Sequence, residues 1–132
     1  MMNRYHKIIL VAIIVLGLFL RFYKLNVNPP GLYWDEAAFG YDAYSILKTG
    51  HDHHGHLMPL FFESFGDWKL PVLFYAIAPS IQLFGLNEFA VRFPSAFAGT
   101  LSILIFYLLV RKLSKNETLA LLSGFFLAIS PW

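Results

Sequence analysis

The chain has 132 residues, of which 58% are hydrophobic and only 14% are charged, and its formal net charge is +2. This balance is too apolar for an ordinary soluble domain of this length and indicates a membrane protein, while so small and scattered a positive charge argues against a nucleic-acid partner. The absence of cysteine excludes a disulfide framework, thiolate metal sites and cysteine nucleophiles.

The first predicted element is a membrane-spanning helix over residues 8–25. Residues 8–20 are uninterruptedly apolar, and basic residues stand at both ends of the run, so that it is long enough for a bilayer core of about 30 Å. The short basic amino terminus predicts that this end of the chain is cytoplasmic. No small-residue cleavage site follows, which favours an uncleaved anchor over the alternative, a signal peptide.

Residues 26–92 are predicted to form an outer loop that carries two interfacial helices. The motif Asn28-Pro29-Pro30-Gly31 cannot continue a helix, so the chain turns there. A helix of mixed polarity then runs over about residues 35–49 and stops at Gly50, and it should lie along the membrane surface. A second helix over about residues 70–85 is apolar for only about a dozen residues, which is short for a crossing.

The second crossing is predicted over residues 93–111, because this apolar run ends in a cluster of basic residues over 111–115 that favours the cytoplasm. The alternative, in which residues 72–84 cross, would place that cluster outside. Residues 117–132 begin a third apolar helix, so we expect the chain to be the amino-terminal piece of a larger protein. The predicted fold class is all-α: a polytopic membrane helical bundle.

Asp35 and Glu36 are adjacent acids that follow soon after a membrane helix. Their ordinary role is structural, with Asp35 as the N-cap of the next helix and Glu36 as a first-turn acid that complements the helix dipole. Their functional role is catalytic, because a carboxylate at the membrane surface could take a proton from an acceptor hydroxyl. The two roles are compatible.

Lys69 and Arg92 are the cations that could meet a lipid-linked phosphate. Lys69 is either an interfacial lysine paired with Asp67 or a point charge for a phosphate, with Trp68 at headgroup depth beside it. Arg92 either anchors a helix end, paired with Glu88, or offers a fork that could grip a phosphate or orient a carboxylate.

Four histidines cluster within residues 51–56, around Asp52 and Gly55. Imidazoles with an aspartate can hold zinc. The loop lacks the fixed spacing that a helix or hairpin would impose, so a solvated loop is favoured over a metal site, and no metal ligands are assigned.

An ordered series of motifs resembles the amino-terminal part of family 39 glycosyltransferases, which include protein O-mannosyltransferases and aminoarabinose transferases. The series is Trp34-Asp35-Glu36, Gly40-Tyr41, Lys48-Thr49-Gly50, Phe65-Gly66-Asp67-Trp68-Lys69-Leu70-Pro71, Phe84-Gly85-Leu86-Asn87-Glu88 and Val91-Arg92-Phe93-Pro94-Ser95-Ala96. The resemblance implies a GT-C fold, a multi-helix membrane bundle whose first outer loop carries an acidic motif and two interfacial helices.

The resemblance also implies roles for individual residues. Asp35 matches the catalytic base or acceptor-orienting acid, with Glu36 as its partner, and Lys69 matches a lysine that contacts the donor phosphate. Arg92 matches a recurring arginine at the start of the next helix, and Asp67 matches an acid that holds the lysine or a cation. Leu70 departs from the family, which usually has proline there.

The expected function is therefore transfer of a sugar from a polyprenyl-phosphate donor to a protein, lipid or glycan acceptor at the outer face of the cell membrane. No cofactor is firmly implied, and a divalent metal ion stays an open alternative. The alternative function is non-catalytic: a small membrane protein or fragment whose outer loop binds a lipid phosphate or a partner. A histidine-loop metal binder is a third alternative.

Overall fold

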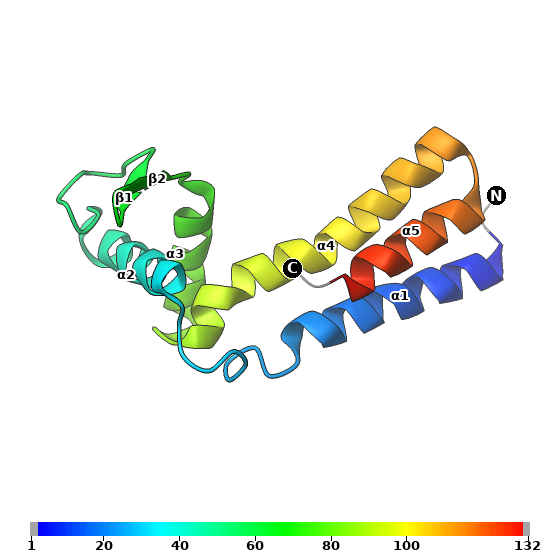
Figure 1. Cartoon of the computed structure of the whole chain (residues 1–132), viewed down its shortest axis with the longest axis horizontal. Helices are drawn as coiled ribbons and strands as arrows, with labels where there is room; N and C mark the ends of the chain where they lie inside the picture. Colours follow the sequence, from blue (N-terminus) through cyan, green and yellow to red (C-terminus); the bar gives the residue numbers. More distant parts are fainter. Residues whose placement is uncertain (1–2, 131–132) are drawn as a thin grey trace. The chain divides into compact units, whose positions relative to one another are not determined.

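The structure is a computed structural model that describes residues 3–130. It is mostly helical (Figure 1), with elements in the order α1 (Arg4–Phe22), α2 (Trp34–Thr49), β1 (Phe62–Ser64), β2 (Asp67–Lys69), α3 (Val72–Phe84), α4 (Glu88–Ser114) and α5 (Glu117–Ile129). The last two residues of the predicted third apolar helix, Pro131 and Trp132, lie outside the described residues. All five predicted helices are present, with ends that differ by a few residues from the expected ones.

The chain divides into two compact units. The first contains the initial 23 residues together with the residues from Ala96 onward, and therefore holds α1, α5 and most of α4. The second is Lys24–Ser95, which holds α2, both strands, α3 and the start of α4.

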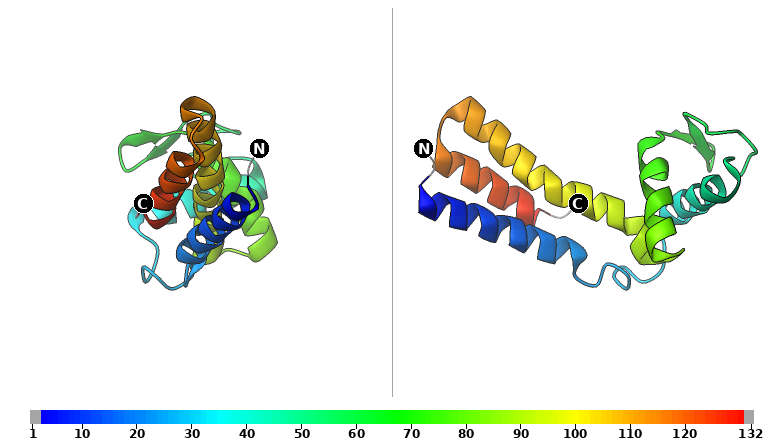
Figure 2. Two further views of the ribbon diagram at one scale, coloured as in Figure 1. Left: turned by 90° about the vertical axis from the view of Figure 1, so that its right-hand side faces the viewer. Right: turned by 180° about the vertical axis from the view of Figure 1, so that it is seen from behind.

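In the first unit, α1, α4 and α5 lie side by side (Figure 2) around a small apolar core. The core side chains are Leu10, Ile13, Ile103, Tyr107, Ala120, Leu121 and Ala128. Among the described residues, α1 and α4 are the helices long and apolar enough to cross a membrane, whereas α3 and α5 are shorter apolar helices. The crossing directions stay a prediction.

Arg21 is one of the basic residues at the far end of the first apolar run. It is buried, and its guanidinium donates to the carbonyls of Leu127 at 2.9 Å, Ala128 at 3.0 Å and Gly17 at 3.3 Å. Because the last carbonyls of a helix have no partner within it, Arg21 satisfies the end of α5.

In the second unit, α2 packs against α3, and the first turns of α4 complete the core. This core contains Ala43 from α2, Ile77, Ala78 and Ile81 from α3, and Ala90 and Val91 from α4. Between the two helices predicted in the outer loop, where no strand was expected, Phe62–Ser64 pairs antiparallel with Asp67–Lys69 around a turn at Phe65 and Gly66, both at positive φ. The Phe62 ring stacks on Phe74 of α3 with ring centroids 3.8 Å apart, which fixes the hairpin to the helix.

The fourth helix begins at Glu88, five residues earlier than the predicted crossing over residues 93–111. The predicted start was that of the apolar run, and the observed helix contains Pro94, which has no N–H to donate to the carbonyl four residues earlier. That carbonyl, of Ala90, instead accepts a hydrogen bond from the Ser80 hydroxyl of α3 at 2.7 Å. A neighbouring side chain thus supplies the missing donor, and the helix runs through the proline.

Candidate functional site

The acidic pair lies in the first turn of α2. The helix begins one residue earlier than expected, with Tyr33 as N-cap, so the prediction that Asp35 is the N-cap is wrong. Glu36 reaches back instead, and its Oε2 accepts from the backbone N–H of Tyr33 at 3.0 Å. Asp35 is left with a side chain that is 46% exposed, so its carboxylate is open to a substrate.

Glu36 forms a two-pronged ion pair with Arg92, from the start of α4. Arg92 Nε donates to Glu36 Oε1 and Nη2 donates to Oε2, both at 2.9 Å. This hydrogen bonding, together with the positive charge of Arg92, holds the pKa of Glu36 below its usual range although burial alone would raise it. Glu36 is therefore an anchored anion rather than a proton carrier at neutral pH.

Arg92 is almost fully buried, with a side chain that is 6% exposed. Its other N–H groups donate to the backbone carbonyls of Leu25, Pro29 and Gly31. An arginine has five N–H donors, and these contacts occupy all five. Arg92 therefore ties the proline-containing turn to α2, and of its two alternatives, a pair with Glu88 or a fork that orients a carboxylate, its contacts with Glu36 fit the second. Its phosphate-binding role stays a prediction.

Lys69, at the end of β2, lies beside the acidic pair. Its Nζ is 2.8 Å from Asp67 Oδ2 and 3.5 Å from Asp35 Oδ1, and its side chain is 24% exposed. The hydrogen bond and the charge of Asp67, with the charge of Asp35, raise the pKa of Lys69, and Lys69 in turn lowers the pKa of Asp67. The site therefore keeps a fixed ammonium group at neutral pH.

Asp67 holds Lys69, as the resemblance implied, and also accepts from the backbone N–H of Trp68 at 2.8 Å. The indole of Trp68 is exposed, and so is Trp34 at the start of α2, whose ring lies 5.9 Å from that of Phe65. The structure thus brings together Asp35, Lys69 and Asp67 from segments more than 30 residues apart, with exposed aromatic rings beside them.

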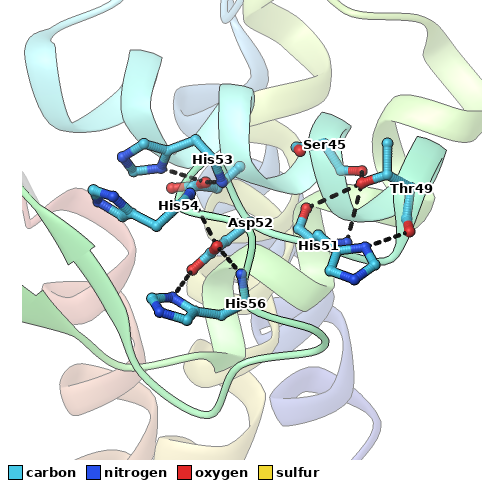
Figure 3. Close-up of polar contacts among 8 residues, drawn as sticks. Ser45, Thr49, His51, Asp52, His53, His54 and His56 are labelled. Atoms are coloured by element: carbon cyan, nitrogen blue, oxygen red, sulfur yellow. Dashed lines mark hydrogen bonds and ion pairs between the residues drawn. The ribbon is translucent and has the colours of Figure 1, made fainter.

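Three of the loop histidines, His53, His54 and His56, are held by aspartates, whereas the His51 ring contacts the Thr49 carbonyl at 2.8 Å. Asp42 Oδ1 accepts from the backbone N–H of His53 at 2.9 Å and lies 2.7 Å from its Nδ1. Asp52 accepts from the backbone N–H groups of His54 and His56 and contacts His56 Nδ1 at 3.0 Å (Figure 3). Within residues 3–130 no group of three His, Cys, Asp or Glu side chains is placed to hold a metal ion.

The expectation of a solvated histidine loop is therefore incomplete. Two buried aspartates, Asp42 and Asp52, hold the loop in a defined conformation. Asp42 was not singled out from the sequence. The signal was an acid within a predicted helix, directly before Ala43 and two residues after Gly40, because a charged side chain that is buried needs a partner.

Comparisons with known proteins place this arrangement in a family. Residues 11–132 match the family model described as dolichyl-phosphate-mannose-protein mannosyltransferase. The chain is 31% identical over 124 residues to an uncharacterized protein of Aquifex aeolicus (strain VF5), covering 94% of this chain and 23% of that protein.

It is also 34% identical over 102 residues to undecaprenyl phosphate-alpha-4-amino-4-deoxy-L-arabinose arabinosyl transferase 2 of Pseudomonas fluorescens (strain Pf0-1), covering 76% of this chain and 18% of that protein. The chain thus spans about a fifth of the length of these relatives. No solved structure matches it at a significant level. The match over nearly the whole chain shows that the protein belongs to the dolichyl-phosphate-mannose-protein mannosyltransferase family.

Proposed function

We propose that this chain is the amino-terminal part of a membrane glycosyltransferase that moves a sugar from a polyprenyl-phosphate donor to a hydroxyl-bearing acceptor at the outer face of the membrane. The observation that carries the proposal is the placement of an exposed carboxylate, Asp35, 3.5 Å from the ammonium group of Lys69. Family membership supports the class of reaction.

The reaction proposed is direct displacement at the anomeric carbon. Asp35 takes the proton from the acceptor hydroxyl, the acceptor oxygen forms a bond to the anomeric carbon, and the bond from that carbon to the phosphate oxygen breaks. The electron pair leaves with the polyprenyl phosphate. Because a phosphate leaves readily as an anion, no protein acid is needed to protonate it.

Lys69 is proposed to bind the donor phosphate and to stabilise the charge that develops on it as the sugar departs. Asp67 positions the ammonium group, and the raised pKa of Lys69 keeps it charged over the physiological pH range. The phosphate would take the place that the Asp35 carboxylate holds near Nζ.

Glu36 and Arg92 are proposed as positioning residues. Their ion pair fixes the first turn of α2 to the turn at residues 25–31, and so it sets the direction of Asp35, the neighbour of Glu36. Because Asp35 is already oriented, little of its conformational entropy is lost when the substrates bind.

The outer-face location is inferred from the basic residues at the amino terminus and after α4. A cytoplasmic amino terminus and a cytoplasmic basic cluster after α4 leave the segment with Asp35 and Lys69 outside. The exposed rings of Trp34 and Trp68 suit headgroup depth, where the phosphate of a membrane-bound donor lies.

The test uses the complete protein that carries this chain, purified from its native membrane. Lys69→Ala should weaken binding of undecaprenyl phosphate by about 10–100-fold, as expected for loss of a charged hydrogen bond. Lys48→Ala, which removes an exposed lysine at the other end of α2, is the matched control and should leave binding unchanged.

Asp35→Asn should bind the same lipid as well as the parent protein does but should transfer no sugar. Equal loss of undecaprenyl phosphate binding in Lys69→Ala and Lys48→Ala would contradict the proposed role of Lys69. Undiminished sugar transfer by Asp35→Asn would contradict the proposal that Asp35 is the base. Phosphate binding without any transfer by the parent protein would favour the non-catalytic alternative.

A further inference from the structure

A pocket of about 420 Å³ opens beside α2 within the second unit. Its volume falls within the roughly 300–1,000 Å³ of sites that bind small molecules. One wall comes from α2 and the other from the histidine loop and the hairpin; the lining includes Ala37, Tyr41, Asp42, His53, Glu63 and Phe65. We call it the dyad pocket, after the pair formed by Asp42 and His53.

The dyad consists of Asp42 and His53, which are joined by hydrogen bonds in the wall of this pocket. Asp42 is fully buried, and its Oδ1 accepts both the backbone N–H and the Nδ1–H of His53. The second oxygen, Oδ2, has no hydrogen-bond partner in the described part of the chain. A buried carboxylate without full compensation is costly, and such groups in a cavity are typical of binding sites.

The dyad fixes what His53 can offer. In the neutral imidazole that donates its Nδ1 proton to Asp42, the other ring nitrogen, Nε2, is an acceptor. The side chain of His53 is 31% exposed, so this acceptor is within reach of a ligand. Glu63 adds a carboxylate to the lining. The pocket therefore calls for a ligand that donates hydrogen bonds.

The charge of the lining excludes one class of ligand. It contains the two carboxylates of Asp42 and Glu63, and none of the described residues that line it is a lysine or an arginine. A phosphate or carboxylate ligand would be repelled there. The anionic donor group belongs at Lys69, outside this pocket.

The aromatic residues of the lining indicate the shape of the ligand. Tyr41 and Phe65 are largely exposed, and a flat ring with apolar C–H faces and a rim of hydroxyls would stack on them while donating to His53 and Glu63. Ala37 of the lining lies on α2, the helix that carries Asp35, and Gly66 of the lining directly precedes Asp67, which contacts Lys69.

We propose that the dyad pocket binds a neutral sugar ring of the acceptor, through the Asp42–His53 pair, so that the acceptor is a glycan or a glycan-bearing molecule. The proposal rests on the proposed function, because it takes Asp35 as the base. It names the acceptor class, and it makes His53 a binding residue and Asp42 a positioning residue.

The test measures binding without donor and without turnover. The complete protein is purified in a detergent that contains no sugar, such as lauryldimethylamine oxide, and saturation-transfer NMR is recorded with the methyl glycosides of glucose, galactose, mannose and N-acetylglucosamine. At least one glycoside should bind. His53→Ala should weaken its binding about tenfold, in line with loss of one well-placed hydrogen bond to a charge-coupled acceptor.

His56→Ala is the matched control, because His56 belongs to the same loop, pairs with Asp52 and does not line the pocket. It should bind as the parent protein does. Ala37→Phe fills the pocket from an exposed helix position and leaves the dyad intact, so it should abolish binding even if the loop of the His53 variant is disturbed.

Absence of binding by all four glycosides would overturn the proposal, as would equal effects of His53→Ala and His56→Ala. Displacement of the glycoside by inorganic phosphate would contradict the charge argument. Methyl glucosaminide, which carries a positive charge, serves as a further probe. If it bound more tightly than the four neutral glycosides, the proposal of a neutral sugar ring would be contradicted. Asp35→Asn should still bind the glycoside, so that failure of the proposed base and failure of the sugar pocket are distinguished.

Discussion

The contact of Arg92 with α2 and the turn before it allows a quantitative prediction. Arg92→Met keeps much of the side-chain volume and removes five hydrogen bonds, two of them to the Glu36 carboxylate and three to the carbonyls of Leu25, Pro29 and Gly31. Breaking a buried ion pair by removing one partner costs about 3–5 kcal/mol. Glu36 is 29% exposed and regains water, so we expect about 3 kcal/mol.

Hydrogen exchange followed by mass spectrometry measures this cost locally. The amides of Val27 and Asn28 donate to the Lys24 carbonyl within the turn that Arg92 holds. A loss of about 3 kcal/mol should speed their exchange by about 100-fold. Arg92→Lys keeps the charge but not the fork and should have an intermediate effect.

A double-mutant cycle with Glu36→Gln separates the ion pair from the backbone contacts. The coupling energy between positions 36 and 92 should be about 1–3 kcal/mol, with the remainder of the Arg92 effect persisting in the Glu36→Gln background. Unchanged exchange of the two amides in Arg92→Met would refute the claim that this arginine orders the turn.

Three further predictions concern the second unit. Gly40→Val should cost about 1–3 kcal/mol, because a Cβ at Gly40 would lie 2.8 Å from a Val91 methyl, and Val91→Ala should relieve most of that cost in a thermal melt. The pKa of Glu36 is lowered in the fold, so its contribution to stability is complete above about pH 4.3 and is lost as the pH falls through the lower folded value; Glu36→Gln should remove this acid dependence. Tyr75→Phe should cost about 1 kcal/mol, because the hydroxyl donates to the Pro59 carbonyl at 2.9 Å, and a chemical denaturation curve would show it.

Much of the helical framework could be predicted from the sequence. The apolar runs set α1 and α4, and glycines mark the ends of α2 and α3, with Gly50 and Gly85 at positive φ. The ends that were wrong depend on distant partners. The start of α4 lies before Pro94 because Ser80 compensates the missing donor, and no local pattern reports that contact.

The sequence singled out Asp35, Asp67 and Lys69 and offered a Lys69–Asp67 pair as one alternative, but it did not place Asp35 beside them. The structure brings the three side chains together, and their roles stay predictions. For Arg92 the sequence left open an ion pair with Glu88 or a fork that orients a carboxylate, and the carboxylate it meets is that of Glu36, 56 residues distant. Such a choice depends on the packing of α2 against the start of α4.

The histidine loop shows the same limit. Its composition suggested either zinc or solvent, whereas the structure pairs the imidazoles of His53 and His56 with Asp42 and Asp52 and that of His51 with the Thr49 carbonyl. Asp42 is 11 residues from His53, and only the folded position of the loop over α2 brings the two together.

The central claim is that Asp35 and Lys69 serve sugar transfer from a polyprenyl phosphate. The most direct measurement is the pool of polyprenyl-phosphate sugars in the native cells, quantified by mass spectrometry after deletion of the gene. Deletion should cause one such sugar lipid to accumulate, the parent gene should return it to its normal level, and equal amounts of the Asp35→Asn protein should not. An unchanged pool after deletion, or full restoration by Asp35→Asn, would contradict the claim.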